Sequence, residues 1–390
     1  MNNRGGGRGK GAGTIVRVVC AALFLAFSII YVYFYQADVL AVTQHALSHG
    51  QTHYSRAVGT PIIVAVLWVV QIWMYGMTRL EGSFHGFTYF PSMLLLAALT
   101  SADVSSAGHV GWGHWPWALP ALIVVWAAVA IVMRRLQDFG VDHGSRGVLF
   151  RPLWVSALSL AAMMLMVGGV ARGDDVFHYR ARAEMCLMRG DDEGAMAAGA
   201  LSTATDPSLT MVRCYALARH GLLGDKLFTY PIAGGADDMV PMEGGAMSTL
   251  IYPRDSVYRM LGAVPAHPMT ATRYLELLEL YGKAGAAVGD YRLCACLIER
   301  DLDTFASLLP HYYAIDDRLP RHYKEALILY SHLRAHPTVI YRDAALDTDF
   351  RDMQQMQAQC ATREERRLRM LDHYFGTYWW YYEYDIKQTH

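Results

Sequence analysis

The chain lacks the sequence motifs that mark the common catalytic and metal-binding sites. It has six cysteines but no CxxC pair, and no Cys/His group has the spacing of a zinc finger. It contains no glycine-rich phosphate-binding loop and no nucleophile–base motif. An excess of basic residues is also absent, since 34 Lys and Arg face 35 Asp and Glu. We therefore predict no metal site, no cofactor and no nucleic-acid partner, and we favour a non-enzymatic role over catalysis.

Long stretches without charge dominate the N-terminal part of the chain. From Pro152 to Ala171 there is no charged residue, and Arg172 follows at once. A helix needs about 20 apolar residues to cross a bilayer. The segment 84–100 is short and contains Pro91, so a re-entrant segment is the alternative there. We predict a flexible basic tail at 1–13 and a membrane domain at 14–171, with five transmembrane helices at about 14–35, 60–78, 84–100, 117–133 and 152–171.

Lys and Arg residues are divided unevenly between the loops that join these segments. Arg56 stands alone on one side of the predicted bilayer. Short loops rich in Lys and Arg stay in the cytoplasm. We therefore predict a multi-pass protein of the cytoplasmic (inner) membrane with a cytoplasmic N-terminus and an extracytoplasmic domain after Ala171; loss of the third span would return that domain to the cytoplasm. The nine basic residues of the other side are Arg4, Arg8, Lys10, Arg17, Arg79, Arg134, Arg135, Arg146 and Arg151.

Acidic residues are almost absent from the predicted spans, which argues against a transporter. Transporters and proton pumps usually carry charged side chains inside the membrane. The Asp and Glu residues of this part all lie in loops or at span ends. They are Asp38, Glu81, Asp103, Asp138 and Asp142.

Histidines in two loops allow a functional and a plain interpretation. His45, His49 and His53 recur every four residues, so a helix would place three imidazoles on one face, as zinc or copper requires. His109 and His114 lie in a loop rich in glycine and tryptophan, where they could contact a substrate. We favour an exposed loop for the first group and a turn in the lipid headgroup layer for the second.

Residues 172–390 have the pattern of a water-soluble helical domain. They carry 24 Lys and Arg against 30 Asp and Glu, and their apolar residues recur at helical spacing. The rhythm breaks at 231–268, which holds five prolines and the acidic pair Asp237 and Asp238, and we predict an irregular insert there. Cys186 and Cys214 fall on neighbouring predicted helices, and whether they pair is left open.

The helices of this domain resemble tetratricopeptide-type (TPR-like) helical hairpins, in which small residues allow two helices to approach closely. The resemblance implies a helical repeat, and with the spans it gives an all-α fold: a multi-span transmembrane bundle followed by a TPR-like soluble domain. The residues that carry it are Tyr179, Ala183, Gly190, Ala195, Ala198 and Pro207, and then Tyr215, Ala216, Ala218 and Gly221.

The last predicted helix, 363–384, ends in a run of aromatic residues. Such rings bind peptides or carbohydrates by stacking, and they also cap a final repeat or contact a membrane surface. We favour a cap or a membrane contact, and the partner-binding alternative would form a site of five residues. Its residues are Tyr378, Trp379, Trp380, Tyr381 and Tyr382.

The whole chain resembles an uncharacterised bacterial family of multi-pass membrane proteins with a C-terminal TPR-like region. The resemblance is carried by the spans and by the segments 177–184, 319–326 and 376–382. It implies location and architecture but no chemistry. Our leading hypothesis is a membrane-anchored scaffold whose helical domain binds a protein partner in the cell envelope, with the lipid bilayer as its other contact.

The alternative hypothesis is an envelope enzyme that acts on a lipid-linked or glycan substrate at the outer membrane–water boundary. Its site would combine His109 and His114 with Asp174 and Asp175, which follow the last predicted span.

Overall fold

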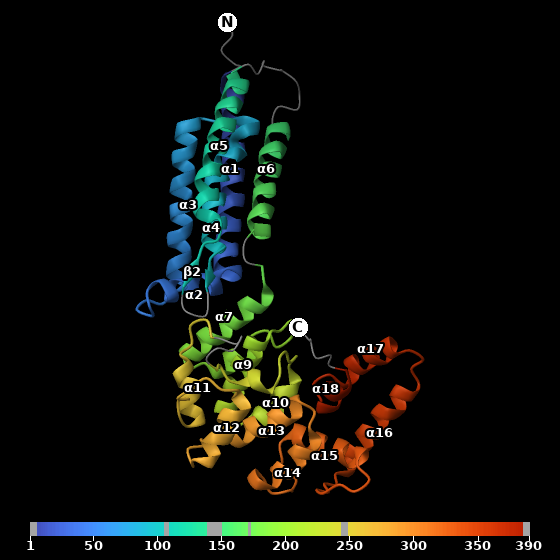
Figure 1. Ribbon diagram of the computed structural model, residues 1–390. Coiled ribbons are helices and arrows are strands. Elements are labelled where there is room, and N and C mark those ends of the chain that lie inside the picture. Colours follow the sequence, from blue (N-terminus) through green and yellow to red (C-terminus); the bar gives the residue numbers. More distant parts are fainter. Residues whose placement is uncertain (1–5, 105–108, 139–149, 171–172, 243–248, 385–390) are drawn as a thin grey trace. The chain divides into compact units, whose positions relative to one another are not determined.

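The regular structure of the protein is almost entirely helical (Figure 1). The computed structural model describes residues 6–104, 109–138, 150–170, 173–242 and 249–384. Within them one short ribbon pairs β1 (Asp103–Val104) antiparallel with β2 (Val110–Gly111). The chain divides into two compact units, Met1–Asp174 and Asp175–His390, close to the predicted boundary.

The first unit is a bundle of apolar helices. Residues 1–5 of the predicted tail lie outside the described residues, and the first helix begins at Gly6, inside the stretch predicted to be flexible. Its helical elements are α1 (Gly6–Ile30), the π-helix η1 (Tyr31–Tyr35), α2 (Ala37–Leu47), α3 (Arg56–Thr78), the 3₁₀ helix η2 (Gly82–Tyr89), α4 (Phe90–Thr100), α5 (Trp115–Asp138) and α6 (Phe150–Val170).

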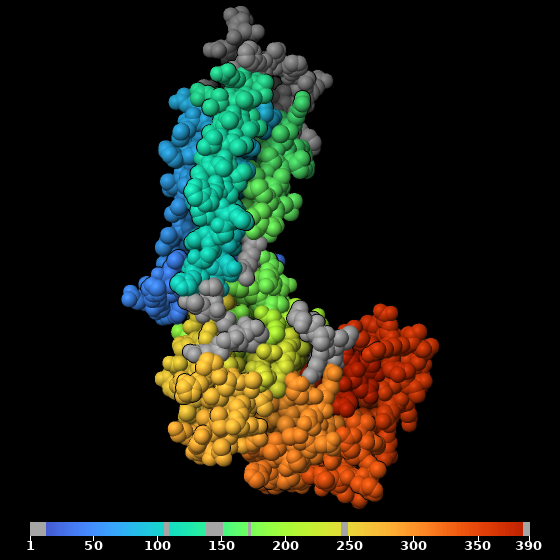
Figure 2. All heavy atoms as spheres, in the orientation of Figure 1, coloured from blue at the N-terminus to red at the C-terminus, as the bar shows by residue number. Residues whose placement is uncertain are grey.

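Four helices of this unit are long and apolar enough to cross a membrane. Most of their side chains are exposed although they are apolar; the α5 span is only 11% buried, and α5 forms much of the face seen in Figure 2. Apolar side chains exposed along a whole helix match a lipid environment rather than water. The four candidate spans are Gly13–Tyr35, Arg56–Thr78, Trp115–Gln137 and Arg151–Val170, close to four of the five predicted segments.

The third predicted span, 84–100, is not a single helix. Its residues belong to η2, which has eight residues and begins two positions earlier at Gly82, and to α4, which has eleven. A 3₁₀ helix rises about 2.0 Å per residue and an α-helix about 1.5 Å, so the two together extend about 32 Å. Ser156 Oγ near the start of α6 donates to Gly82 O at 2.8 Å, and Ser101 Oγ donates to Val170 O at 3.3 Å at the other end. The segment therefore runs beside α6 along its whole length.

This broken segment lies at the centre of the first unit, and most of α4 is buried. Ser92 Oγ donates to Leu67 O at 2.8 Å, which ties the segment to α3. On the α5 side, Trp126 Nε1–H donates to Phe87 O at 3.0 Å. Such bonds matter in a bundle of this kind because hydrocarbon offers no water to satisfy polar groups.

Gly86 on η2 makes the close contact between this segment and α6. A Cβ added there would lie 2.4 Å from both Ser156 O and Ser159 Oγ, whereas one added at Gly76 on α3 would meet nothing within 4 Å. We expect Gly86→Ala to destabilise the protein by about 1–3 kcal/mol through overpacking. Gly76→Ala is expected to be neutral or to stabilise by up to about 1 kcal/mol. Thermal unfolding of both purified variants in one detergent tests this, and equal midpoints would contradict it.

The second unit consists of short helices, and most consecutive helices, α11 excepted, pack against one another. Many begin at a side-chain cap; Asp206, for example, accepts from Leu209 N at 2.6 Å before Pro207 opens its helix. Their bounds are α7 (Asp175–Met188), α8 (Asp192–Ala197), α9 (Pro207–Arg219), α10 (Leu223–Lys226), η3 (Leu227–Thr229), η4 (Ala236–Met239), α11 (Arg254–Leu261), α12 (Ala271–Leu280), α13 (Val288–Ile298), α14 (Leu302–Tyr312), α15 (Arg321–Leu333), α16 (Ala344–Ala358), α17 (Arg363–Tyr374) and α18 (Tyr378–Tyr384).

The predicted insert 231–268 is irregular except for η4 and α11, and its residues 243–248 lie outside the described part. Its acidic pair is engaged in local contacts. Asp237 accepts from Thr272 N at 3.0 Å, and Asp238 accepts from Gly235 N at 2.8 Å. The insert is fixed to α7 by Glu184, whose buried carboxylate accepts from the backbone amides of 250–252.

Candidate functional site: a groove between α15 and α16

Two residues in the sequence mark the starts of the helices that flank the groove. Pro320 precedes the first residue of α15, where its fixed φ suits a helix start. Asp343 caps α16 by accepting from Ala345 N at 3.0 Å and Leu346 N at 3.1 Å. The connection between the helices, residues 334–343, is irregular and forms one wall of the groove.

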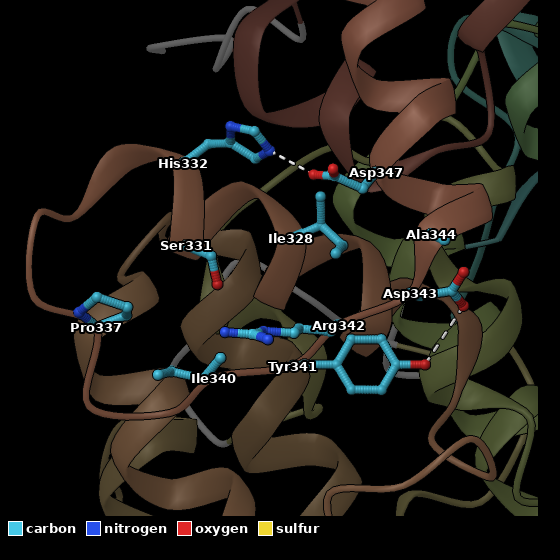
Figure 3. A pocket seen from close by; sticks show the side chains of 10 residues that line it. All are labelled: Ile328, Ser331, His332, Pro337, Ile340, Tyr341, Arg342, Asp343, Ala344 and Asp347. Carbon is cyan, nitrogen blue, oxygen red and sulfur yellow. Dashed lines mark hydrogen bonds and ion pairs between the residues drawn. The ribbon is translucent and has the colours of Figure 1, made fainter.

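The groove has a volume of about 490 Å³, which is within the range of small-molecule and peptide pockets (Figure 3). Its walls are partly apolar and partly charged. Ile340 contributes a side chain that is 61% exposed. The lining residues are Ile328, Ser331 and His332 from α15, Pro337, Ile340, Tyr341, Arg342 and Asp343 from the connection, and Ala344 and Asp347 from α16.

Both carboxylates of the groove are already engaged. Asp347 contacts His332 Nε2 at 2.7 Å and Arg351 at 2.6 Å, and the hydrogen bond from His332 and the charge of Arg351 hold the pKa of Asp347 below its usual value. Asp343 accepts from the Tyr341 hydroxyl at 3.4 Å in addition to capping α16. Burial and the Asp343 charge raise the pKa of Tyr341 to about 12, so this hydroxyl stays protonated.

Arg342 takes part in none of these contacts. It is exposed, it has no ion-pair partner among the described residues, and it points toward the side of the groove formed by Ser331 and Ile340 (Figure 3). An uncompensated guanidinium beside apolar side chains suits a ligand that combines a carboxylate with apolar groups. Sequence reasoning missed Arg342, because the sequence does not show whether an arginine has an acidic partner in the folded protein.

The aromatic run predicted to bind a partner is placed mainly in the core. The side chains of Tyr378, Trp379, Trp380 and Tyr381 are buried, and Tyr382 is partly exposed. The Tyr378 and Tyr381 hydroxyls donate to Leu297 O at 3.2 Å and Ile298 O at 2.9 Å, at the C-terminal turn of α13. This position differs from the expected accessible stacking surface, because two of the hydroxyls donate to carbonyls of α13 and Trp379 donates to α15.

The single predicted helix 363–384 is also two helices. Gly376 between them has φ +86°, a left-handed conformation that ends α17 and that other residues rarely adopt. The chain then turns so that Tyr378 N donates to the buried Glu325 carboxylate at 2.6 Å. Sequence periodicity did not reveal the break, although glycine after the charged helix was its signal.

The histidine groups do not form a metal site among the described residues, where no three His, Cys, Asp or Glu side chains are placed to hold an ion. His45 and His53 stack at 6.1 Å, whereas His49 occupies a turn at φ +50°. His109 and His114 are exposed.

The two acidic residues that follow the last predicted span belong to different units. Asp174 ends the first unit and Asp175 opens α7 in the second. All six cysteines are free thiols, so Cys186 and Cys214 are not bridged.

One ionisable side chain inside the first unit was overlooked. His85 on η2 is 2% exposed, and its ring lies edge-on to Tyr75 at 5.3 Å and to Tyr89 at 5.7 Å. Its Nδ1 lies 3.3 Å from Leu80 O and must carry the proton, because a carbonyl oxygen only accepts. Its Nε2 has no partner among the described residues. The sequence shows this histidine within the predicted span 84–100, but the argument about charge in the spans considered only Asp and Glu.

Comparison with protein families gives a match for the part of the chain that holds the groove. Residues 270–385 match the family described as "Family of unknown function (DUF6057)". The match includes α12 to α18, and thus the groove and the aromatic run, but less than a third of the chain. Comparison with curated proteins and with solved structures gives no match. The chain is therefore similar to this family over its last helices, and the similarity assigns no activity.

Proposed function

We propose that this protein is a membrane-anchored scaffold whose second unit binds a protein partner in the cell envelope. The observation that carries the proposal is the groove between α15 and α16, which presents the free Arg342 guanidinium beside Ile328 and Ile340. The ligand that fits is a peptide segment of the partner in which an acidic group lies next to apolar side chains. Packing of consecutive helices in this unit supports a TPR-like helical repeat as the binding scaffold.

The proposed location is the cytoplasmic membrane with the N-terminus inside and the second unit outside. Support comes from the basic residues of alternate loops and from the η2–α4 segment, which bonds to α6 at Ser156 and Val170 and which we propose as a fifth crossing beside the four candidate spans. An odd number of crossings places the second unit opposite the N-terminus. An epitope tag after His390 is expected to bind antibody on intact spheroplasts; detection only after permeabilisation would contradict this orientation.

The groove is tested by photo-crosslinking of the full-length protein in the cells that produce it. A photoreactive residue at Ile340 is expected to capture one protein, and the same residue at Leu280, which is 71% exposed on α12 and outside the groove, is expected not to. Arg342→Glu should reduce the Ile340 product at least ten-fold, because it replaces attraction of an acidic segment with repulsion. Equal products at both positions, or a product unchanged by Arg342→Glu, would remove the groove from the proposal.

A further inference from the structure

A second, smaller cavity lies beside the start of α13, outside the groove. It has a volume of about 200 Å³ and is lined by Glu279, Asp290, Tyr312, Tyr313 and the glycine-rich loop 284–289. This volume is far more than one water molecule needs. It is therefore large enough for a small organic molecule or for the end of one side chain.

The two carboxylates of this cavity differ in their charge balance. Glu279 is paired with Arg292 and also accepts from the Tyr312 hydroxyl, so its charge is compensated. Asp290 accepts from the Tyr313 and Tyr323 hydroxyls at 2.7 and 2.9 Å, both through Oδ1, and has no ion-pair partner among the described residues. A carboxylate that is largely withdrawn from water and lacks a counter-ion is costly.

The pKa of Asp290 responds to the groups that surround it. Burial raises the pKa of Asp290, the two tyrosine hydroxyls oppose that effect, and the nearby carboxylate of Asp225 raises it further, with a net increase. Asp225 accepts from the backbone amide of Arg321 at 2.7 Å and supplies no cation. Among the described residues, no cation is therefore paired with the charge of Asp290.

We propose that this cavity binds a primary ammonium group, which donates to Oδ2 of Asp290. A guanidinium binds carboxylates through both oxygens, and Oδ1 already accepts from two tyrosines, so a compact ammonium fits and a planar fork does not. Tyr312 and Tyr313 also line the cavity. The ammonium is that of a free amine or of a lysine side chain, and the proposal is independent of the groove.

The test measures binding to the full-length protein in lipid nanodiscs by calorimetry. Butylammonium is expected to bind, whereas 1-butanol and methylguanidinium bind at least ten-fold more weakly; equal affinity of either would overturn the proposal. Nα-acetyl-lysine amide separates the sources. Binding as tight as that of butylammonium supports a lysine of a protein ligand, and binding of butylammonium alone supports a free amine.

Two further measurements connect the binding to Asp290. Asp290→Asn should weaken butylammonium binding at least ten-fold. The control Asp303→Asn, at an exposed carboxylate paired with Arg334, should leave it unchanged. For the wild type, affinity should fall from about pH 7 to about pH 4 as Asp290 takes up a proton while the amine stays charged. Unchanged binding in Asp290→Asn would overturn the proposal. A wild-type affinity that does not change over this pH range would also overturn it, and that measurement does not depend on how the variant folds.

Discussion

Replacing Glu184 by alanine is expected to destabilise the second unit by about 3–5 kcal/mol, one of the largest effects of any single substitution in the chain. Glu184 on α7 is 0% exposed. It accepts from Leu250 N at 2.9 Å, Ile251 N at 2.8 Å and Tyr252 N at 2.9 Å, and it pairs with Arg180 at 3.3 Å. The substitution leaves these donors without their acceptor, and the cost of unpaired groups exceeds the value of the bonds.

Hydrogen exchange locates this effect better than a melting temperature alone. In Glu184→Ala the amides of 250–252 should lose protection, and the thermal midpoint of the second unit should fall by about 10 °C. Glu193→Ala is the matched control, because Glu193 is exposed on the neighbouring α8 and should change stability by no more than about 0.5 kcal/mol. If the three amides stay protected in Glu184→Ala, Glu184 does not anchor the insert.

The role of Glu184 also shows where sequence reasoning stops. Its acceptor oxygens are matched to backbone amides more than 60 positions away, and every residue except proline offers such an amide. No pattern of side chains therefore distinguishes this glutamate from the others. The same holds for Arg342 and for Asp290. Each matters because no oppositely charged side chain lies beside it, and only the folded chain shows which side chains become neighbours.

The membrane part was easier to predict, because charge-free runs of spanning length have few alternatives. Four predicted spans agree with the candidate spans within a few residues. The segment 84–100 was identified as unusual through Pro91. The sequence analysis did not predict its division into η2 and α4, in which Gly86 lies close to α6.

The pattern of the aromatic run at the C-terminus favours burial over a stacking surface. Four consecutive aromatic residues, 378–381, cover every side of a helical turn, and a helix that is apolar all round is buried. The structure places α18 against α15, where Trp379 Nε1–H donates to Glu325 O at 2.7 Å. A run of aromatics spaced to one side of the helix would have favoured the surface.

The comparison of Trp379→Ala with Tyr382→Ala separates a core role from a binding role. Trp379 is 2% exposed and its ring lies 5.1 Å from that of Phe350, so its removal should cost about 3–5 kcal/mol. Tyr382 is partly exposed, and Tyr382→Ala should cost about 1 kcal/mol or less. Thermal unfolding of the full-length variants, followed by circular dichroism, measures both values.

The opposite pattern would restore the aromatic run as a partner-binding surface. If Trp379→Ala unfolds like the wild type but loses the product captured at Ile340, the rings act on the partner and not on the core. If Trp379→Ala unfolds at a lower temperature, and Tyr382→Ala keeps both its stability and the captured product, then α18 stabilises the groove by packing against α15. We expect the second result, because Glu325 bonds to Tyr378 N at 2.6 Å on the helix that forms one wall of the groove.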